Sequence, residues 1–264
     1  MRRKIKEPAG IGSVETGARL LAGLADMTGP KTLTALAAGA GMVPAKAHRY
    51  ITSLVRSGLA ERDPLTGRYS LGPLSRQIGM ATLYDMDAVR LAMPRLPQIR
   101  DQVGETVVLI VWGHYGPTVV HTEEARRAIN VTIRPGSVLP MLLSAAGRVF
   151  SAWLPRSATA PLISRERAAL RRSSRSHAVF DVRQFEAILS DVRKRGVARS
   201  AEEVYPGIFG LSTPIFDKSG SIVAALAIFS STAVFRRKRQ EPIARKLKAA
   251  GKQLSDLLAP PASI

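Results

Sequence analysis

The stretch that most constrains the fold of this 264-residue chain runs from Gly41 to Gly58. On a helix of about 3.6 residues per turn, Ala47, Ile51 and Leu54 fall on one face. The opposite face carries short or cationic side chains, with Lys46 at its margin: Ala45, Arg49, Thr52, Ser53 and Arg56. The inner face can pack against a core. The outer face can approach a surface closely, because its short residues leave room for cations to reach phosphates and base edges.

The flanking segments predict a winged helix-turn-helix. Upstream, residues 31–38 read as a short helix with a Thr cap, followed by a glycine turn at 39–41. Downstream, two short extended runs at 58–62 and 67–72 flank the turn Asp63-Pro64-Leu65-Thr66 and predict a hairpin. The alternative, two ordinary core helices, requires neither this order nor a basic outer face. The pattern therefore favours DNA binding.

Composition permits this interpretation without proving it. The chain has 39 basic and 20 acidic residues, a net charge of +19, and 45% hydrophobic residues. Residues 1–75 contain eleven basic and five acidic residues, and residues 76–264 contain 28 and 15, so the charge is not confined to the winged helix. Excess positive charge favours polyanions but confers no sequence preference. An arginine-rich soluble surface is the alternative explanation.

Several functional classes are disfavoured. There is no cysteine, the basic N-terminus lacks an apolar signal core, and no apolar run approaches the roughly 20 residues of a membrane helix. We expect a cytoplasmic protein without a membrane partner. The spacing of His114, His121 and His177 matches no metal signature, and Ser144 lacks a nucleophile elbow. No phosphate-binding glycine loop is present, so we expect no metal, no cofactor and no enzyme activity.

The rest of the chain predicts an α+β second domain. Short Val-, Ile- and Thr-rich runs predict strands at 106–112, 117–122, 128–134, 197–202, 208–216 and 222–229. Helices are expected at 141–153, 181–194 and 236–258, with an arginine-rich polar segment at 165–176. The glycine loop before residue 141 leaves free N–H groups at a helix start, which can hold an anion. The predicted order is a basic arm (1–12), winged helix-turn-helix (13–73), linker helix (74–90), second domain (91–258) and tail (259–264).

Motifs in both halves of the chain resemble those of the IclR family of bacterial transcription regulators. In the N-terminal half these are Leu33-Thr34-Ala35-Leu36-Ala37, Ala47-His48-Arg49, Gly58-Leu59 and Gly67-Arg68-Tyr69-Ser70-Leu71-Gly72. In the C-terminal half they are Gly104-Glu105-Thr106-Val107, Arg134-Pro135-Gly136-Ser137-Val138-Leu139-Pro140, Gly147, Gly207, Pro214-Ile215-Phe216-Asp217 and Gly220. No single motif decides the match; their order and spacing across the chain carry it.

The resemblance implies a winged helix-turn-helix joined by a linker helix to a GAF/PAS-like antiparallel-sheet effector domain. It implies a homodimer through the DNA-binding domains, often paired into a homotetramer, on a double-stranded operator. A small organic acid is the expected effector, and the regulator acts as repressor or activator. The alternative is a basic nucleic-acid-binding protein with a degenerate, unliganded effector domain. An enzyme ranks third.

Carried over residue by residue, the resemblance places Ala45, Lys46, His48 and Arg49 against DNA, where the family commonly has Ser-Thr in place of Ala45-Lys46. His48 has two interpretations, base contact or bracing of the helix. Arg68 in the wing is expected at a phosphate or in the minor groove. The complete expected DNA-binding set is Lys31, Thr34, Pro44, Ala45, Lys46, His48, Arg49, Ser53, Arg68 and Tyr69.

The same residue-by-residue comparison with the family predicts an effector pocket lined by three segments of the chain. The expected residues are Met141, Leu142, Ser144, Ala145, Ala146, Ile208, Phe209, Gly210, Leu211, Ala227 and Phe229. Phe209-Gly210 stands where the family often has Arg-Cys, and Ala227, Phe229 and Ser230 replace its frequent Ser-x-Ser-Gly. These changes remove donors and add aromatic area. We therefore expect an aromatic or medium-length carboxylic acid, with a pocket filled by its own side chains as the alternative.

Overall fold

The computed structural model describes residues 10–25, 29–125, 133–172, 181–233 and 240–258. The chain forms two compact units that divide between Thr82 and Leu83. Each unit has its own apolar core. The first unit contains the predicted winged helix-turn-helix, and the second contains the predicted antiparallel sheet.

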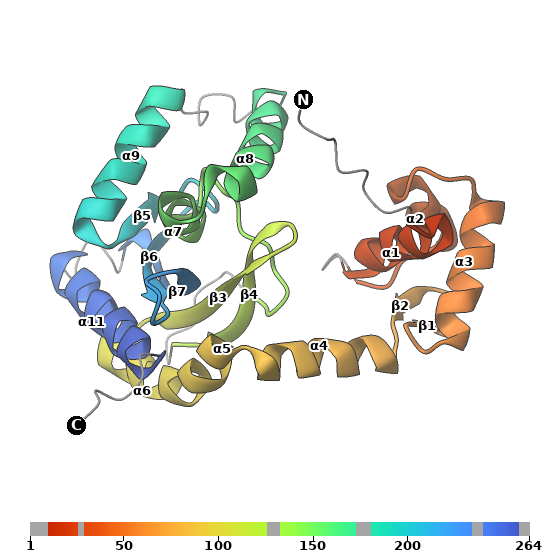
Figure 1. The fold of residues 1–264 in the computed structure, drawn as a ribbon, viewed down its shortest axis with the longest axis horizontal. Helices are drawn as coiled ribbons and strands as arrows, with labels where there is room; N and C mark the ends of the chain where they lie inside the picture. Colours follow the sequence, from red (N-terminus) through yellow and green to blue (C-terminus); the bar gives the residue numbers. More distant parts are fainter. Residues whose placement is uncertain (1–9, 26–28, 126–132, 173–180, 234–239, 259–264) are drawn as a thin grey trace, which may run out of the picture. The chain divides into compact units, whose positions relative to one another are not determined.

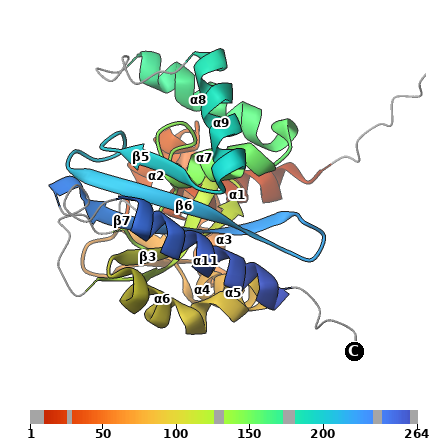
Figure 2. The same cartoon turned by 90° about the vertical axis from the view of Figure 1, so that its left-hand side faces the viewer.

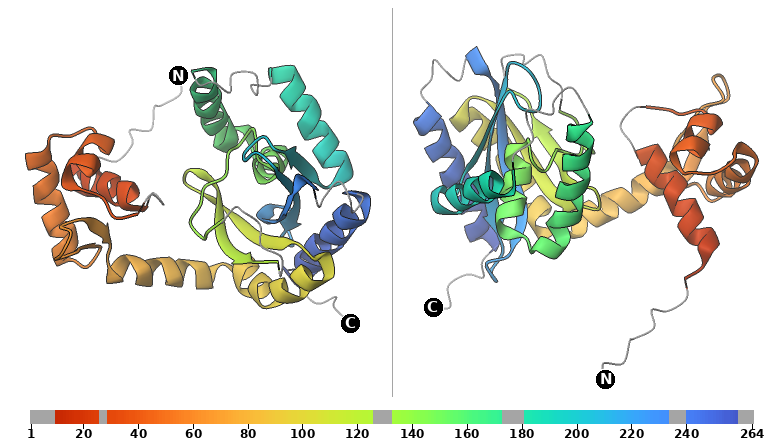
Figure 3. Two further views of the ribbon diagram at one scale, coloured as in Figure 1. Left: turned by 180° about the vertical axis from the view of Figure 1, so that it is seen from behind. Right: turned by 90° about the horizontal axis from the view of Figure 1, so that it is seen from above.

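Three helices and a hairpin make up the first unit. They are α1 (Gly12–Ala25), α2 (Leu33–Gly39), α3 (Pro44–Arg56), β1 (Ala60–Arg62) and β2 (Tyr69–Leu71). Leu20, Leu36 and Ile51 are the centre of the core, each no more than 2% exposed. The helices, red to orange, stay grouped in both views of Figure 3. Because three different helices contribute to one apolar cluster, the inner face of α3 is fixed and its outer face is free.

Local signals set these boundaries. The Thr32 hydroxyl accepts a hydrogen bond from the N–H of Ala35 (3.3 Å) and caps α2, as the sequence predicted. Strands β1 and β2 pair antiparallel around the predicted turn. At the end of the hairpin, a Cβ on Gly72 would lie 2.3 Å from the Gly58 carbonyl oxygen, so only glycine fits this close approach.

Helix α4 (Pro73–Asp85) follows the hairpin and has no buried residue. Its apolar side chains are exposed instead, including Ile78 (51%), Met80 (72%) and Tyr84 (72%). The linker helix expected over 74–90 is interrupted, because Met86 adopts an extended conformation and α5 (Asp87–Ala92) begins after it. A helix without a buried face within its own chain needs another surface to be stable.

The second unit is built on a five-stranded antiparallel sheet in the order β4-β3-β7-β6-β5. Its strands are β3 (Thr106–Gly113), β4 (Gly116–Glu123), β5 (Ala198–Ala201), β6 (Ile208–Phe216) and β7 (Ile222–Ser231). Figure 1 shows the sheet with its covering helices. Central strands β6 and β7 are almost entirely buried, because helices cover both faces.

Two layers of helices cover the sheet. On one face lie α5, α6 (Leu96–Val103) and α11 (Gln240–Leu258), packed on a cluster that includes Leu211 and Ile228. On the other lie α7 (Ala145–Trp153) and α9 (Val182–Arg195), with α8 (Arg156–Arg171) beside α7. Figure 2 shows α8 and α9 above the sheet and α11, α6 and α5 below it. A short 3-10 helix, η1 (Met93–Arg95), separates α5 from α6 at Pro94, which has no backbone N–H to continue an α-helix.

Two expectations for this unit need correction. The helix expected from Met141 starts at Ala145, because residues 141–143 form a turn and the Ser144 hydroxyl caps the Gly147 N–H at 2.9 Å. The expected polar segment at 165–176 is helical as far as Arg171, although Pro161 lies inside α8. A polar helix with an internal proline lacks the apolar periodicity that sequence reasoning requires. Residues 128–132 and 236–239 lie outside the described residues, whereas Ile133 and Arg134 are not in a strand.

Candidate DNA-binding surface and effector site

The outer face of α3 is a continuous exposed surface. Ala47 and Ile51 are fully buried and Leu54 is 9% exposed, which confirms the predicted inner face. The exposed residues expected at DNA are Thr34, Pro44, Ala45, Lys46, His48, Arg49 and Ser53. His48 is exposed and does not pack into the core as a brace. Two hydroxyls are already occupied, because Thr52 donates to the His48 carbonyl (2.8 Å) and Ser53 to that of Arg49 (3.2 Å).

The wing adds a further cation, Arg68, whereas Tyr69 does not lie on the exposed surface where it was expected. Arg68 is exposed and its Nη1 donates to the Pro30 carbonyl at 3.2 Å. The backbone of Lys31 pairs with that of Tyr69 (2.9 and 2.8 Å), which joins the wing to the segment before α2. The Tyr69 ring is only 6% exposed and lies under the Arg62 guanidinium, so its role is in the core rather than at DNA. The sequence alone does not distinguish these two roles for an aromatic residue that follows a wing cation.

The turn of the wing is held by Asp63. Its carboxylate accepts the N–H groups of Leu65 (2.8 Å) and Thr66 (3.1 Å). These hydrogen bonds stabilise the ionised form and lower the pKa of the Asp63 carboxyl. Leu65 at the tip is 94% exposed. The wing therefore has a defined shape that places its arginines outside the core.

The expected effector residues divide between two faces of the sheet. Phe209 and Leu211 belong to the cluster under α5, α6 and α11. On the opposite face, in the cluster under α7 and α9, lie Leu142, Ala145, Ala146, Ile208, Ala227 and Phe229. Because side chains alternate along a strand, neighbours in β6 cannot line one cavity. The expectation that all eleven residues line a single pocket is therefore wrong.

The space expected for the effector is also packed. Leu142 is 0% exposed, Ala146 1% and Phe229 8%. A Cβ built on Gly210 would lie 3.6 Å from the Phe229 ring and 2.9 Å from the Ser200 hydroxyl, so little space remains beside this glycine. Ser144 is buried as the cap of α7 and donates to the Pro140 carbonyl at 2.6 Å. Apart from Met141, the expected residues are thus buried in packing and do not line the open cavity beside the loop before α7 or any other described one.

A cavity of about 540 Å³ opens on the outer side of that loop. Met141 is the only one of the eleven expected residues that lines it. Its other walls come from the β3–β4 turn, from the loop and from α8: Tyr115, Val138, Leu139, Pro140, Leu143, Leu162, Arg165, Glu166, Ala169 and Leu170. The residues of α8 were missed because residues 156–171 show no clear apolar periodicity of a helix. The lining is mostly apolar, with one carboxylate and one guanidinium.

The carboxylate of Glu166 occupies the backbone donors that the sequence suggested for an anion. It accepts the N–H of Met141 (2.5 Å) and that of Leu142 (3.2 and 3.3 Å). The pKa of Glu166 is nevertheless raised, because burial disfavours its charged form more than the backbone hydrogen bonds favour it. An internal carboxylate thus stands where an organic acid could bind.

Arg148 joins this loop to the sheet. It is 5% exposed; its Nε donates to the Leu142 carbonyl (3.0 Å), its Nη1 to the Arg199 carbonyl, and its Nη2 to Glu203 (2.7 Å). The buried guanidinium is therefore matched by acceptors on three sides. Leu142 belongs to the loop and Arg199 to β5, so the hydrogen bonds of Arg148 connect the loop with the sheet.

The stability of the second unit should depend on pH through the ionisation of Glu166. Its pKa is raised on folding, so the folded state binds more protons, and stability is lost as pH rises from the unfolded value through the folded one. Glu166→Gln cannot ionise. We expect the melting temperature of Glu166→Gln to rise relative to that of the wild type over the pH range above about 4.3, the ordinary pKa of a glutamate. A difference that stays constant over that range would show that the burial of Glu166 does not govern its ionisation.

No metal site is present among the described residues, where no cluster of three or more His, Asp or Glu side chains forms. His121 pairs with Glu123 at 2.9 Å, whereas His114 packs edge-on against Tyr115. His177 lies outside the described residues. Within the same part of the chain, no helix is long and apolar enough to cross a membrane.

Comparison with known proteins decides the family. A family model described as the bacterial transcriptional regulator IclR C-terminal domain matches residues 80–256, and the IclR helix-turn-helix domain matches residues 13–64. The chain belongs to the IclR family. It is an IclR-type DNA-binding transcriptional regulator with an effector-binding domain. The winged helix-turn-helix and the antiparallel-sheet effector domain expected from the resemblance are confirmed.

Relatives cover nearly the whole of this IclR regulator. The glycerol operon regulatory protein of Streptomyces coelicolor is 29% identical over 91% of the chain and 92% of its own length. The crystal structure of Pseudomonas aeruginosa HmgR is 35% identical, with a TM-score of 0.59, over 96% and 100%. An IclR homologue from Microbacterium hydrocarbonoxydans, complexed with 4-hydroxybenzoate, shares the fold at 20% identity and a TM-score of 0.73 over 93% and 98%.

Proposed function

We propose that this regulator binds a near-palindromic operator through α3 and the wing and changes its DNA affinity when a small aromatic acid occupies the cavity beside residues 138–143. The observation that carries the DNA part is the division of α3 into a fully packed inner face and an exposed cationic outer face. A helix of this kind beside a hairpin matches the geometry of major-groove recognition.

The proposed DNA contacts follow from exposure. Ala45, Lys46, His48 and Arg49 face the major groove, and Arg49 has the reach and fork geometry to read a guanine. Arg68 in the wing contacts the backbone or the minor groove. The surrounding contacts come from Lys31, Thr34, Pro44 and Ser53. Tyr69 is not among them, because its ring belongs to the core.

We propose a homodimer, further paired into a homotetramer through the effector units. The exposed apolar residues of α4, among them Ile78 and Met80, and Val14 of α1 (66% exposed) are the support for a partner subunit. Association would bury this surface. Sedimentation at micromolar concentration should give a mass at or above twice 28.4 kDa. A single monomeric species, with and without DNA, would argue against this assembly.

The proposed effector is a small aromatic carboxylic acid. The ring would lie between apolar walls that include Tyr115, Leu143 and Leu162, and the carboxylate near Arg165. To reach the N–H groups of Met141 and Leu142, the ligand carboxylate must displace Glu166. The cavity of about 540 Å³ is ample for one ring. The bound 4-hydroxybenzoate of the Microbacterium homologue supports the same ligand class.

A screen of aromatic, aliphatic and two-carbon acids by thermal shift, followed by operator titration, tests this proposal. We expect aromatic acids to stabilise the protein and to change operator affinity by about 1–3 kcal/mol. Glu166→Ala should tighten acid binding because it frees the loop donors, and Arg165→Gln should weaken it. Response to two-carbon acids alone, or binding that leaves operator affinity unchanged, would contradict the proposed effector class.

The second candidate is a basic nucleic-acid-binding protein with an unresponsive effector unit. The packing of Leu142, Ala146 and Phe229 favours it, because the expected inner pocket is filled. The same screen separates the two, since this alternative gives no ligand response. In both cases we propose action by binding alone, in the cytoplasm, without enzyme activity, metal or cofactor.

A further inference from the structure

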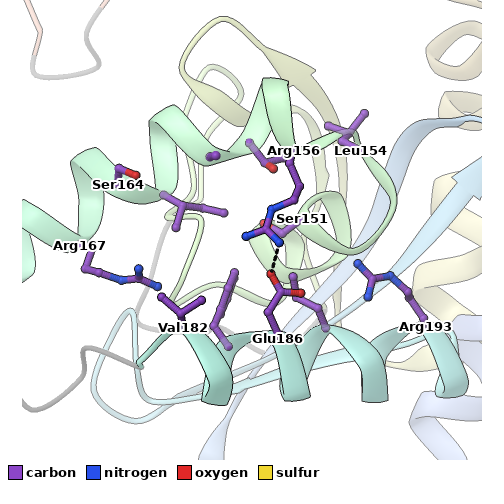
Figure 4. Close-up of a pocket in the computed structure, with 13 residues that line it drawn as sticks. Ser151, Leu154, Arg156, Ser164, Arg167, Val182, Glu186 and Arg193 are labelled. Atoms are coloured by element: carbon purple, nitrogen blue, oxygen red, sulfur yellow. Dashed lines mark ion pairs between the residues drawn. The ribbon is translucent and has the colours of Figure 1, made fainter.

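Helix α8 borders a second cavity on a different face. This cavity, of about 210 Å³, lies between α7, α8 and α9 (Figure 4). The residues of α8 that line it, such as Ile163 and Arg167, are all different from those that line the effector cavity. Its apolar wall includes Phe185 and Leu189 of α9. The two cavities are therefore distinct places on one helix.

The polar lining of the second cavity is cationic. Three arginines face one carboxylate, and that carboxylate, Glu186, is paired with Arg156 at 3.2 Å. Arg193 donates from its Nε to the Ala152 carbonyl at 2.7 Å. Figure 4 shows the Arg156–Glu186 pair across the middle, with Arg167 toward one end and Arg193 toward the other. The single pair leaves an excess of positive charge in the cavity.

Two donors in this cavity have no acceptor among the described residues. The Nε of Arg167 is buried and unpartnered there. The hydroxyl of Ser151 is likewise buried and unpartnered, in a residue only 6% exposed. Buried polar groups normally have a partner, because a donor removed from water without one costs free energy. Two such donors lining one cavity point to a ligand that supplies acceptors.

We propose that this cavity binds a small aromatic carboxylate that carries a second oxygen substituent. The carboxylate accepts from Arg167, the second oxygen accepts from Ser151, and the ring packs on Ile163, Phe185 and Leu189. The cavity of about 210 Å³ has room for a single ring, since an apolar cavity of about 150 Å³ can hold benzene. The excess positive charge of the cavity favours an anionic ligand. The apolar wall disfavours inorganic phosphate, because it would leave phosphate oxygens without hydrogen-bond donors. This site is additional to the proposed effector cavity and does not depend on it.

The isoleucine methyl resonance of Ile163 reports directly on this site. Titration of the full-length protein with benzoate should shift that resonance saturably, whereas benzamide, the neutral analogue, should not. 4-Hydroxybenzoate should bind more tightly than benzoate because it supplies the second acceptor. The methyl resonances of Leu143, which lines the other cavity, report effector binding separately. A failure of one site is thereby distinguished from a failure of the other.

Charge-matched variants on α8 sharpen the test. Arg167→Gln should weaken benzoate binding at the Ile163 site about tenfold or more, since it removes a charged donor. Arg171→Gln, an exposed position that lines neither cavity, should not weaken it. Arg165→Gln should affect only the Leu143 response. Equal effects of Arg167→Gln and Arg171→Gln would overturn the proposal.

The variant Ser151→Ala provides a second test of this site. Because the hydroxyl has no partner among the described residues, its removal should leave the melting temperature unchanged or raised. The variant should bind benzoate normally but lose the preference for 4-hydroxybenzoate. No saturable shift of Ile163 at millimolar benzoate, or a preference that survives in Ser151→Ala, would count against this site.

Discussion

Replacing Arg49 with Ala should weaken operator binding by about 1–3 kcal/mol, roughly five- to 150-fold, if the guanidinium reads a base. Arg49 is exposed on the outer face of α3, on the turn between Lys46 and Ser53, while the inner face of the same helix is fully packed. The substitution should therefore leave the fold intact. Titration of operator and of random duplex at one salt concentration measures the effect.

The ratio of operator affinity to random-duplex affinity distinguishes a base contact of Arg49 from a phosphate contact. If Arg49 contacts a base, Arg49→Ala should lose affinity for the operator and sequence preference at one position in each half-site. If Arg49 contacts a phosphate, the variant should bind both duplexes more weakly by the same factor. Arg195→Ala is a suitable control, because it removes one exposed cation paired with Asp191 in the effector unit. Its operator affinity should stay close to that of the wild type. Equal losses on both duplexes would assign Arg49 to the backbone.

Replacing Gly147 with Ala should destabilise the effector unit by about 1–3 kcal/mol. A Cβ at this position would lie 2.2 Å from the Pro140 carbonyl oxygen and 2.5 Å from that of Met141. Alanine normally gains up to about 1 kcal/mol over glycine inside a helix. Overlap with two backbone oxygens outweighs this gain, because neither oxygen can move without moving the loop. Thermal unfolding measures the net loss.

The same substitution should also disturb ligand binding. Gly147 lets the first turn of α7 approach the loop that presents the N–H groups of Met141 and Leu142. Gly39→Ala at the end of α2 is the control, because this exposed glycine has no neighbour within 4 Å of a built Cβ among the described residues. It should be neutral or slightly stabilising. If both variants melt alike, the close approach at Gly147 is not what requires a glycine.

The sequence predicted the first unit better than the second. Alternation of apolar and polar positions over one helical repeat was enough to place Ala47, Ile51 and Leu54 in the core. The strands predicted at 208–216 and 222–229 were also found, the second extending to Ser231, since apolar runs that contain Ile, Val and Thr favour strands. Both predictions depend on local periodicity, which the sequence contains directly.

The effector site required information that is not local. The sequence located the loop before α7 and its backbone donors, but Glu166, which occupies them, lies 25 residues from Met141. It comes from a helix whose polar composition and internal Pro161 conceal its periodicity. Phe209 was assigned to the wrong side because a strand buried on both faces gives no alternation to read. Tertiary packing alone settles such positions.

The ratio of operator affinity to scrambled-duplex affinity at one fixed salt concentration tests the central claim most directly. The operator would be obtained by selection from random duplexes and the scrambled control matched in length and composition. A regulator that reads bases through α3 should bind its operator at least about 10³-fold more tightly than the control. If selection enriches no motif, or both duplexes bind alike with the steep salt dependence of phosphate contacts alone, the exposed face of α3 does not read sequence.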